Sequence, residues 1–223
     1  MKNNVLVIAA HPDDEILGAG GTMIKHVSQG DSLHILLLGD GESSRKTMHR
    51  IEQRAKQAHT AAQKLGAKNV FLEKLPDNQF DSIPLLQIAQ LAEKYILKIK
   101  PTIIYTHFAH DLNIDHQLTF QAVLTACRPQ PNFFVKKILS FEILSSTEWQ
   151  YKSKELIFSP SEYVNISPFI EKKLKLMNIY KNELRDFPHP RSLEGIRTLA
   201  RYRGMEVGLN YAEAFEVVRQ IIK

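Results

Sequence analysis

Two short segments of the chain concentrate side chains that bind metal ions or move protons. The first segment, directly after a short apolar run, is His11-Pro12-Asp13-Asp14-Glu15. Pro12 has a fixed φ and disfavours helical geometry at His11, so we expect a tight turn here. His11 and Asp14 are three residues apart, close enough on such a turn to bind one ion. Asp13 lies between them, placed to face the same cavity without binding the ion.

The second segment spans residues 110–116 and contains two histidines and two aspartates. Catalytic zinc takes three protein ligands and keeps a fourth position for water, and two imidazoles with one carboxylate make such a set. A further carboxylate beside the metal can move the proton of that water. Taken singly, acidic residues after a strand often cap the next helix, and a histidine there is often structural. The joint placement of the two segments favours a metal site.

Alternating apolar and amphipathic stretches predict the elements that carry these segments. Expected strands are Val5 to Ala10, Ser32 to Leu38, Asn69 to Leu72, Thr102 to Thr106 and Ile138 to Ile143. Expected helices are Glu15 to Ser28, Arg45 to Leu65, Leu85 to Ile99 and His116 to Cys127, and the tail from Ser167 to Lys223 also looks helical. This order predicts an α/β, Rossmann-like, mostly parallel sheet with helices on both faces and a helical C-terminal segment. Both segments then follow carboxyl ends of strands, where such sheets bind ligands.

Composition limits the function classes. The 223 residues carry a formal charge of +5, and the basic residues are dispersed rather than gathered in a stripe, which argues against a nucleic-acid partner. Cys127 is the only cysteine, so no intrachain disulfide can form. No export signal and no apolar stretch of membrane-spanning length is visible. We expect one cytoplasmic domain over residues 1–223 that acts on a small molecule, and leave homo-oligomerisation open.

The first segment also carries a family resemblance. Ala10-His11-Pro12-Asp13-Asp14-Glu15, followed by Gly18-Ala19-Gly20-Gly21-Thr22, closely resembles the signature of the PIG-L/LmbE-like deacetylases. The resemblance extends through Asp115-His116 to Tyr211-Ala212-Glu213-Ala214-Phe215. It implies a zinc enzyme that removes acetyl groups from N-acetylated amino sugars and related glycoconjugates.

By position, the resemblance assigns roles to individual residues. His11, Asp14 and His116 match the zinc ligands, Asp13 matches the general base, and Arg54 looks like the arginine that these enzymes direct at the substrate. Asp115, beside the last ligand, is expected to support the metal ligands from outside their shell.

One position departs from the family pattern. Many relatives have a histidine three residues before the last ligand, where it stabilises the oxyanion, and this chain has Asn113. An amide can donate a hydrogen bond but cannot act as a cationic acid. Asn113 is therefore a substrate-binding candidate, with His110 and His189 as alternative donors, or Asp13 handles both proton transfers.

The substrate and two rival functions stay open. Arg54, Arg45 and Arg191 are candidate ligands for a phosphate or carboxylate, which favours an anionic, for example nucleotide-activated, N-acetyl sugar over a neutral one. His189 and Arg191 lie on a proline-framed loop that forms either a rigid turn or a lid over the substrate. Rival functions are a metal- or sugar-binding module without turnover and a nucleotide-dependent oxidoreductase. The glycines at 18, 20 and 21 lack the dinucleotide-binding spacing, so we expect them to serve close helix packing.

Overall fold

The computed structural model describes residues 2–43, 48–131 and 133–222. Arg45 is the predicted first residue of the second helix and a candidate ligand for an anionic group, and it lies outside the described residues. Within these ranges, no helix combines the length and the apolar character needed to cross a bilayer.

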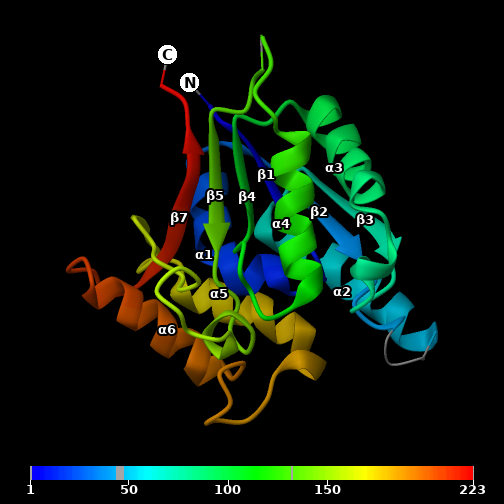
Figure 1. The fold of residues 1–223 in the computed structure, drawn as a ribbon. Helices are drawn as coiled ribbons and strands as arrows, with labels where there is room; N and C mark the ends of the chain where they lie inside the picture. Colours follow the sequence, from blue (N-terminus) through cyan, green and yellow to red (C-terminus); the bar gives the residue numbers. More distant parts are fainter. Residues whose placement is uncertain (1, 44–47, 132, 223) are drawn as a thin grey trace.

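One seven-stranded sheet runs through the structure in the order β3-β2-β1-β4-β5-β7-β6, and Figure 1 labels all of these strands except β6. The first five strands pair in parallel, and β7 pairs antiparallel with both β5 and β6. The strands are β1 (Asn4–Ala9), β2 (Ser32–Gly39), β3 (Asn69–Leu75), β4 (Ile103–His107), β5 (Lys137–Phe141), β6 (Glu162–Asn165) and β7 (Ala212–Gln220). The predicted α/β fold with a mostly parallel sheet is therefore confirmed.

Helices cover both faces of this sheet. They are α1 (Asp14–Ser28), α2 (Met48–Leu65), α3 (Leu85–Ile99), α4 (Ile114–Ala126), α5 (Ile170–Met177) and α6 (Leu193–Met205), with 3₁₀ turns η2 (Phe80–Ser82), η3 (Thr147–Trp149) and η4 (Asn178–Glu183). Helices α1, α2, α5 and α6 pack on one face, and α3 and α4 pack on the other. The expected helices agree with α1 to α4 within a few residues.

The buried strands supply both cores by simple alternation. In β1, Val5 and Val7 point into the core under α1, whereas Leu6 and Ile8 point into the core under α3 and α4. Successive side chains of a strand face opposite sides of the sheet, so a strand covered on both faces needs apolar residues throughout. This requirement explains the nearly unbroken apolar runs in the sequence.

The strand order creates a switch point between β1 and β4. From β1 the chain winds outward through β2 and β3, and it then returns to place β4 on the other side of β1. The connection after β1 leads to β2 on one side, and the connection after β4 leads to β5 on the other side. Because these two connections diverge, a crevice opens beyond the carboxyl ends of β1 and β4. Both predicted chemical segments begin at those ends.

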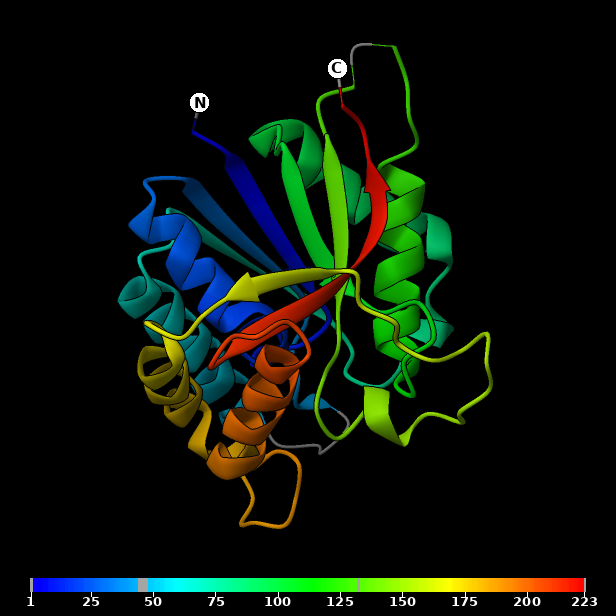
Figure 2. The same cartoon turned by 90° about the vertical axis from the view of Figure 1, so that its left-hand side faces the viewer.

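The C-terminal tail is only partly helical. Helices α5 and α6 confirm the first part of the prediction, but Ala212–Gln220 forms strand β7, and β6 was not predicted. β7 gains its hydrogen bonds from β5, with Phe215 paired to Phe141, and the local sequence does not reveal this long-range ladder. Both chain ends consequently lie at the same end of the sheet (Figure 2).

The glycine cluster lies at a break in α1. Ala19 has φ −139°, outside helical values, and a Cβ on Gly21 would come within 2.7 Å of Ile166. Close packing therefore requires the small residue, as predicted. In a regular helix the Gly21 N–H would donate to the Leu17 carbonyl.

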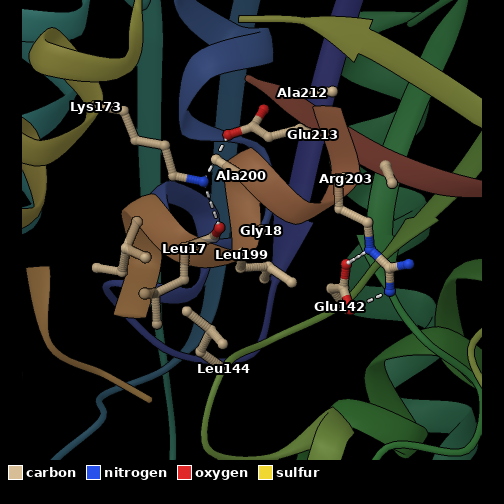
Figure 3. A pocket seen from close by; sticks show the side chains of 12 residues that line it. Leu17, Gly18, Glu142, Leu144, Lys173, Leu199, Ala200, Arg203, Ala212 and Glu213 are labelled. Carbon is tan, nitrogen blue, oxygen red and sulfur yellow. Dashed lines mark hydrogen bonds and ion pairs between the residues drawn. The ribbon is translucent and has the colours of Figure 1, made fainter. Parts of the chain in front are cut away.

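A buried ion pair replaces the hydrogen bond lost at this break. The Gly21 N–H donates to Glu213 at 2.8 Å, and Lys173 Nζ donates to the Leu17 carbonyl at 2.8 Å. Lys173 and Glu213 pair with each other at 2.7 Å (Figure 3). The small cavity beside them, about 20 Å³, has room for about one water molecule. We therefore interpret this region as a structural feature that stabilises the break in α1, not as a ligand site.

Candidate active site

The turn after β1 presents three acidic or imidazole groups in a fixed arrangement. The His11 N–H donates to Asp14 Oδ2 at 2.9 Å, which closes the turn on itself. Asp13 precedes α1 with φ 116°, a backbone conformation that costs a non-glycine residue roughly 1–3 kcal/mol. Such strain persists only where the surroundings enforce it. The side chains of His11, Asp13 and Asp14 are all buried.

The segment after β4 turns into α4 in a similarly ordered way. Asn113 caps the helix, because its side-chain Oδ1 accepts the Asp115 N–H at 2.8 Å. The cap begins the helix at Ile114, and His116 then lies in the first turn with 2% of its surface exposed. The helix thus directs His116 into the crevice at the switch point.

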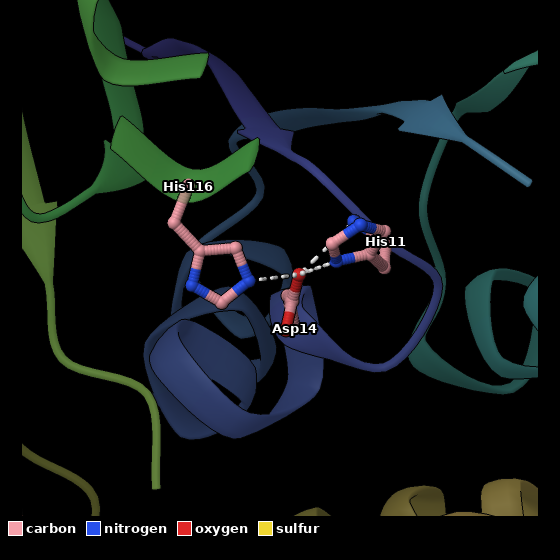
Figure 4. A group of neighbouring side chains, drawn as sticks. All are labelled: His11, Asp14 and His116. Atoms are coloured by element: carbon pink, nitrogen blue, oxygen red, sulfur yellow. Dashed lines mark hydrogen bonds and ion pairs between the residues drawn. The ribbon is translucent and has the colours of Figure 1, made fainter. Parts of the chain in front are cut away.

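His11, Asp14 and His116 converge there (Figure 4). Asp14 Oδ2 lies 3.3 Å from His11 Nδ1 and 3.2 Å from His116 Nε2, and the three ligand atoms all lie within 4.8 Å of one another. Two imidazole nitrogens and one carboxylate oxygen form the donor set of a catalytic zinc site. The three residues of the predicted site are brought together, and their chemistry fits a divalent ion.

The remaining imidazole nitrogens are held by carboxylates. His11 Nε2 lies 2.8 Å from Asp115 Oδ2 and 3.2 Å from Asp77 Oδ1. His116 Nδ1 lies 3.0 Å from Asp111 Oδ1. Metal-binding histidines are usually oriented in this way by a carboxylate on the opposite nitrogen. Asp115 was expected to support the ligands, whereas sequence reasoning assigned no role to Asp77 or Asp111.

A second group, His11, Asp77 and Asp115, also has metal-binding spacing. Asp115 is already occupied there, because its two oxygens accept the backbone N–H groups of Asn78 at 2.7 Å and Phe80 at 3.0 Å. We therefore favour the group centred on Asp14 as the metal site.

The electrostatics of the cluster suit a cation. Burial alone would lower the pKa of both imidazoles, but the surrounding carboxylates outweigh it and raise the pKa of His11 to about 10 and that of His116 to about 9. Burial acts to raise the pKa of Asp14, yet the neighbouring histidines hold this pKa well below its usual value. Without a metal, the carboxylates therefore favour positive charge on the rings, which is the charge that a metal ion would supply.

Asp13 lies beside the cluster and faces two arginines. Its Oδ2 is 3.4 Å from Arg191 Nη1 and 3.6 Å from Arg54 Nη2. Burial raises the pKa of Asp13 to about 6, although both guanidinium groups act to lower it. Asp13 is not part of the metal-binding group, and it lines the same pocket as the three ligand residues.

Arg54 is 4% exposed and forms part of the wall of the crevice. Its Nη2 lies 3.3 Å from Glu183, and its guanidinium lies 5.6 Å from the centre of the Tyr180 ring. Its Nε and Nη1 make no hydrogen bond within the described ranges. Glu183 and Tyr180 come from the C-terminal tail and carry no local motif, so the sequence did not reveal them.

The three candidate metal ligands and Asp13 line a pocket of about 190 Å³. Arg54, Asn113 and Arg191 belong to the same lining. The tail thus reaches the open end of the sheet, because Glu183 and Arg191 line this pocket. The structure does not bring His189 into the lining; its Nδ1 accepts the Arg191 N–H at 3.0 Å, and its ring meets Trp149 edge-on. His110 is exposed and also lies outside the lining.

His107, at the end of β4, is a further buried histidine that sequence reasoning missed. Its ring stacks on His116 with centres 3.9 Å apart and 18° between the planes. Its Nε2 accepts the Ala10 N–H at 2.8 Å, and burial holds its pKa well below the usual value. It therefore packs as a neutral ring between β1 and the His116 side chain.

Comparison with known proteins adds the family. Residues 6–127 match the family model PIG-L, described as GlcNAc-PI de-N-acetylase. The chain is 25% identical over 195 residues to a probable N-acetyl-alpha-D-glucosaminyl L-malate deacetylase 2 of Bacillus cereus, covering 82% of this chain and 84% of the relative.

Solved structures agree on the fold. A conserved protein from Thermus thermophilus matches with a TM-score of 0.79 and 26% identity, over 99% of this chain and 97% of the other. The N,N'-diacetylchitobiose deacetylase of Pyrococcus horikoshii, solved with an inhibitor, matches with a TM-score of 0.76 and 22% identity, over 96% and 83%.

Proposed function

The chain belongs to the PIG-L family of GlcNAc-PI de-N-acetylases, and we propose that it removes the acetyl group of an N-acetylamino sugar with a zinc ion held by His11, Asp14 and His116. The supporting observation is the convergence of the three ligand atoms at the switch point. Mixed nitrogen and oxygen ligation suits zinc. When bound, the ion supplies a Lewis acid for the acetyl carbonyl and lowers the pKa of water.

Asp13 is the proposed proton carrier. It accepts a proton from the attacking water and returns it to the leaving amine, so that the amide gives an acetate and a free amino sugar. Its burial and its place beside the metal ligands support this role, because a site that only binds metal has no use for another carboxylate there. Arg54 and Arg191 hold the Asp13 carboxylate in place.

Asn113 is the proposed donor to the acetyl oxygen. Its Oδ1 is engaged in capping α4, so its amide nitrogen is the end left for the pocket. One of the two amide hydrogens is used by Asn78 Oδ1, at 3.3 Å, and the other remains available. His110 and His189 are less suited, because neither lines the pocket.

The proposed substrate carries an anionic group next to the N-acetylamino sugar. Arg54 and Arg191 line the pocket, and Arg54 Nη1 and Arg191 Nε make no hydrogen bond in the described part of the chain, which supports this choice. Arg54 Nε already faces Glu42 Oε1 at 3.9 Å. The Bacillus cereus relative is named for a substrate with a malate group, which is anionic, whereas the Pyrococcus horikoshii structure is named for a neutral disaccharide.

Pocket size separates the anionic candidates. Ligand pockets usually measure about 300–1,000 Å³, and this pocket measures about 190 Å³. It accommodates one sugar unit, so the nucleotide of an activated sugar would lie outside it.

We propose that residues 1–223 act as a single PIG-L-like domain, because β7 completes the sheet that β1 begins.

Acetate release together with metal content tests this function. The chain, loaded with zinc, is assayed on free N-acetylglucosamine, an N-acetylglucosaminide with a carboxylated aglycone and a UDP-linked N-acetyl sugar. We expect fastest release from the carboxylated glycoside, with a KM that rises in Arg54→Ala, because the substrate carboxylate then loses a guanidinium partner. Metal binding without release of acetate from any substrate would instead favour a binding module. Binding of a nicotinamide cofactor would favour an oxidoreductase.

A further inference from the structure

Among the residues that the structure describes, the pocket offers a sugar almost no apolar surface. Apart from Gly41, every described residue that lines it is polar or charged, including Asp77, Ser145 and Ser146. Sugars linked to a second group also present C–H faces, whose burial against apolar atoms is favourable. An apolar contact for such a ligand must therefore come from outside the pocket.

Two loops that contribute to the pocket meet at an aromatic pair. Ser146 and Arg191 both line the pocket. Trp149, at the end of η3, lies three residues after Ser146, and His189 lies two residues before Arg191. The rings of Trp149 and His189 lie 5.6 Å apart at 83°, an edge-to-face contact. His189 in turn accepts the Arg191 N–H. The pair thus joins two loops that each carry a residue lining the pocket, Ser146 on one and Arg191 on the other.

Trp149 is not a core residue. Its side chain is 52% exposed, and it contributes to neither of the two buried clusters. Because about half of its surface is exposed, a large part of the indole remains open to a ligand. Tryptophan combines a large apolar surface with few rotatable bonds, which favours its use as a rigid contact.

We infer that Trp149, braced by His189, forms the apolar wall of a second subsite, which binds the group linked to the N-acetylamino sugar. The ligand class is a glycoside whose linked group has an apolar face in addition to the proposed anionic group, and a second pyranose ring or a phenyl group represents that face alone. This inference rests on the proposed function, since it takes the adjacent pocket as the site of the N-acetylamino sugar.

The intrinsic fluorescence of the protein gives a direct test, because Trp149 is the only tryptophan of the chain. The zinc-loaded protein is titrated with deacetylated products, which bind without turnover: glucosamine, its methyl glycoside, its phenyl glycoside and a diglucosamine. Calorimetry measures the affinity in parallel. We expect a saturable change in emission with the phenyl glycoside and the disaccharide, at the same Kd as calorimetry, and a much smaller change with glucosamine.

Variants separate the indole from general surface effects. Trp149→Ala should weaken the disaccharide about tenfold by calorimetry, and Trp149→Phe should recover most of that loss. Tyr151→Ala, at a neighbouring position that is 77% exposed, is the matched control and should leave the Kd unchanged. Disaccharide binding by calorimetry without a change in emission, or equal losses in the Trp149 and Tyr151 variants, would overturn the subsite.

Failure of the proposed function would look different. If no substrate releases acetate while the emission still titrates with the disaccharide, the subsite stands and the deacetylase proposal is wrong. If acetate is released normally and Trp149→Ala has the wild-type KM for every glycoside, the subsite is wrong and the deacetylase proposal stands.

Discussion

Asp115 directly precedes His116 in the chain, yet its carboxylate holds the other imidazole of the site: Oδ2 lies 2.8 Å from His11 Nε2. Consecutive residues of a helix point about 100° apart, so Asp115 and His116 reach different partners from one turn. Through the backbone of Asn78 and Phe80, Asp115 also anchors the loop after β3. A single side chain thus connects three segments of the site.

Metal affinity should depend on the carboxylates that hold the imidazoles. Asp115→Asn and Asp111→Asn should each weaken zinc about 10- to 100-fold, because the histidines lose the acceptor that orients them. His116→Ala should lose the ion almost entirely. A chelator competition measures the Kd, with the exposed Glu93→Gln on α3 as control. Full zinc affinity in both aspartate variants would show that these contacts do not orient the ligands.

Asp13 should affect turnover and leave the metal in place. Asp13→Asn keeps the size of the side chain but removes the group that carries the proton, and we expect activity to fall by about two to four orders of magnitude. Acetate release is compared at equal zinc content, measured by elemental analysis. Turnover near the wild-type value at equal occupancy would remove Asp13 from the mechanism.

The two functions of Asn113 can be separated by substitution. Asn113→Ser retains an oxygen that caps α4 and removes the amide donor, whereas Asn113→Ala removes both. We expect kcat to fall about 10- to 1,000-fold in both variants, but only Asn113→Ala should lose about 1 kcal/mol of stability. Kinetics and urea unfolding check the pair. An active Asn113→Ser enzyme would exclude the amide as the oxyanion donor.

The ion pair at the break in α1 should matter for stability. Lys173→Met leaves Glu213 buried without its cation, which should cost about 3–5 kcal/mol. The matched control is Arg197→Met, which breaks an ion pair with the exposed Glu171 and should change stability little. Urea unfolding compares the two variants. Similar small effects would mean that the backbone hydrogen bonds alone satisfy Glu213.

Acid stability should depend in part on Asp31. Burial acts to raise the pKa of Asp31, but hydrogen bonds from His26 and Asn3 outweigh it and hold this pKa below its usual value. A carboxyl whose pKa is lower in the folded state stabilises the fold above its unfolded pKa and loses this contribution as the pH falls through the folded value. Asp31→Asn should therefore destabilise at pH 6 and have a smaller effect near pH 3. Thermal unfolding at both pH values tests this; an equal loss at both would contradict it.

The sequence by itself determined the parts with a local signature. The apolar run of β1 and the order of strands and helices identified the sheet, because burial on both faces requires unbroken apolar strands. The turn from His11 to Asp14 was recognisable because Pro12 and the three-residue spacing act within one segment. His116 could be matched by its place in the motif after β4. These features depend on neighbours in the chain, which a sequence displays directly.

Only the tertiary structure decided which distant groups complete the site. Asp111 reaches His116 while its own oxygens accept hydrogen bonds from the hydroxyls of Ser146 and Thr147, and Glu183 meets Arg54 from a tail segment without any motif. β7 became a strand because β5 offered it an open edge, which local propensity does not record. Such contacts follow from the strand order and the packing of α5 and α6, because long-range pairing and burial determine them and their residue types alone do not.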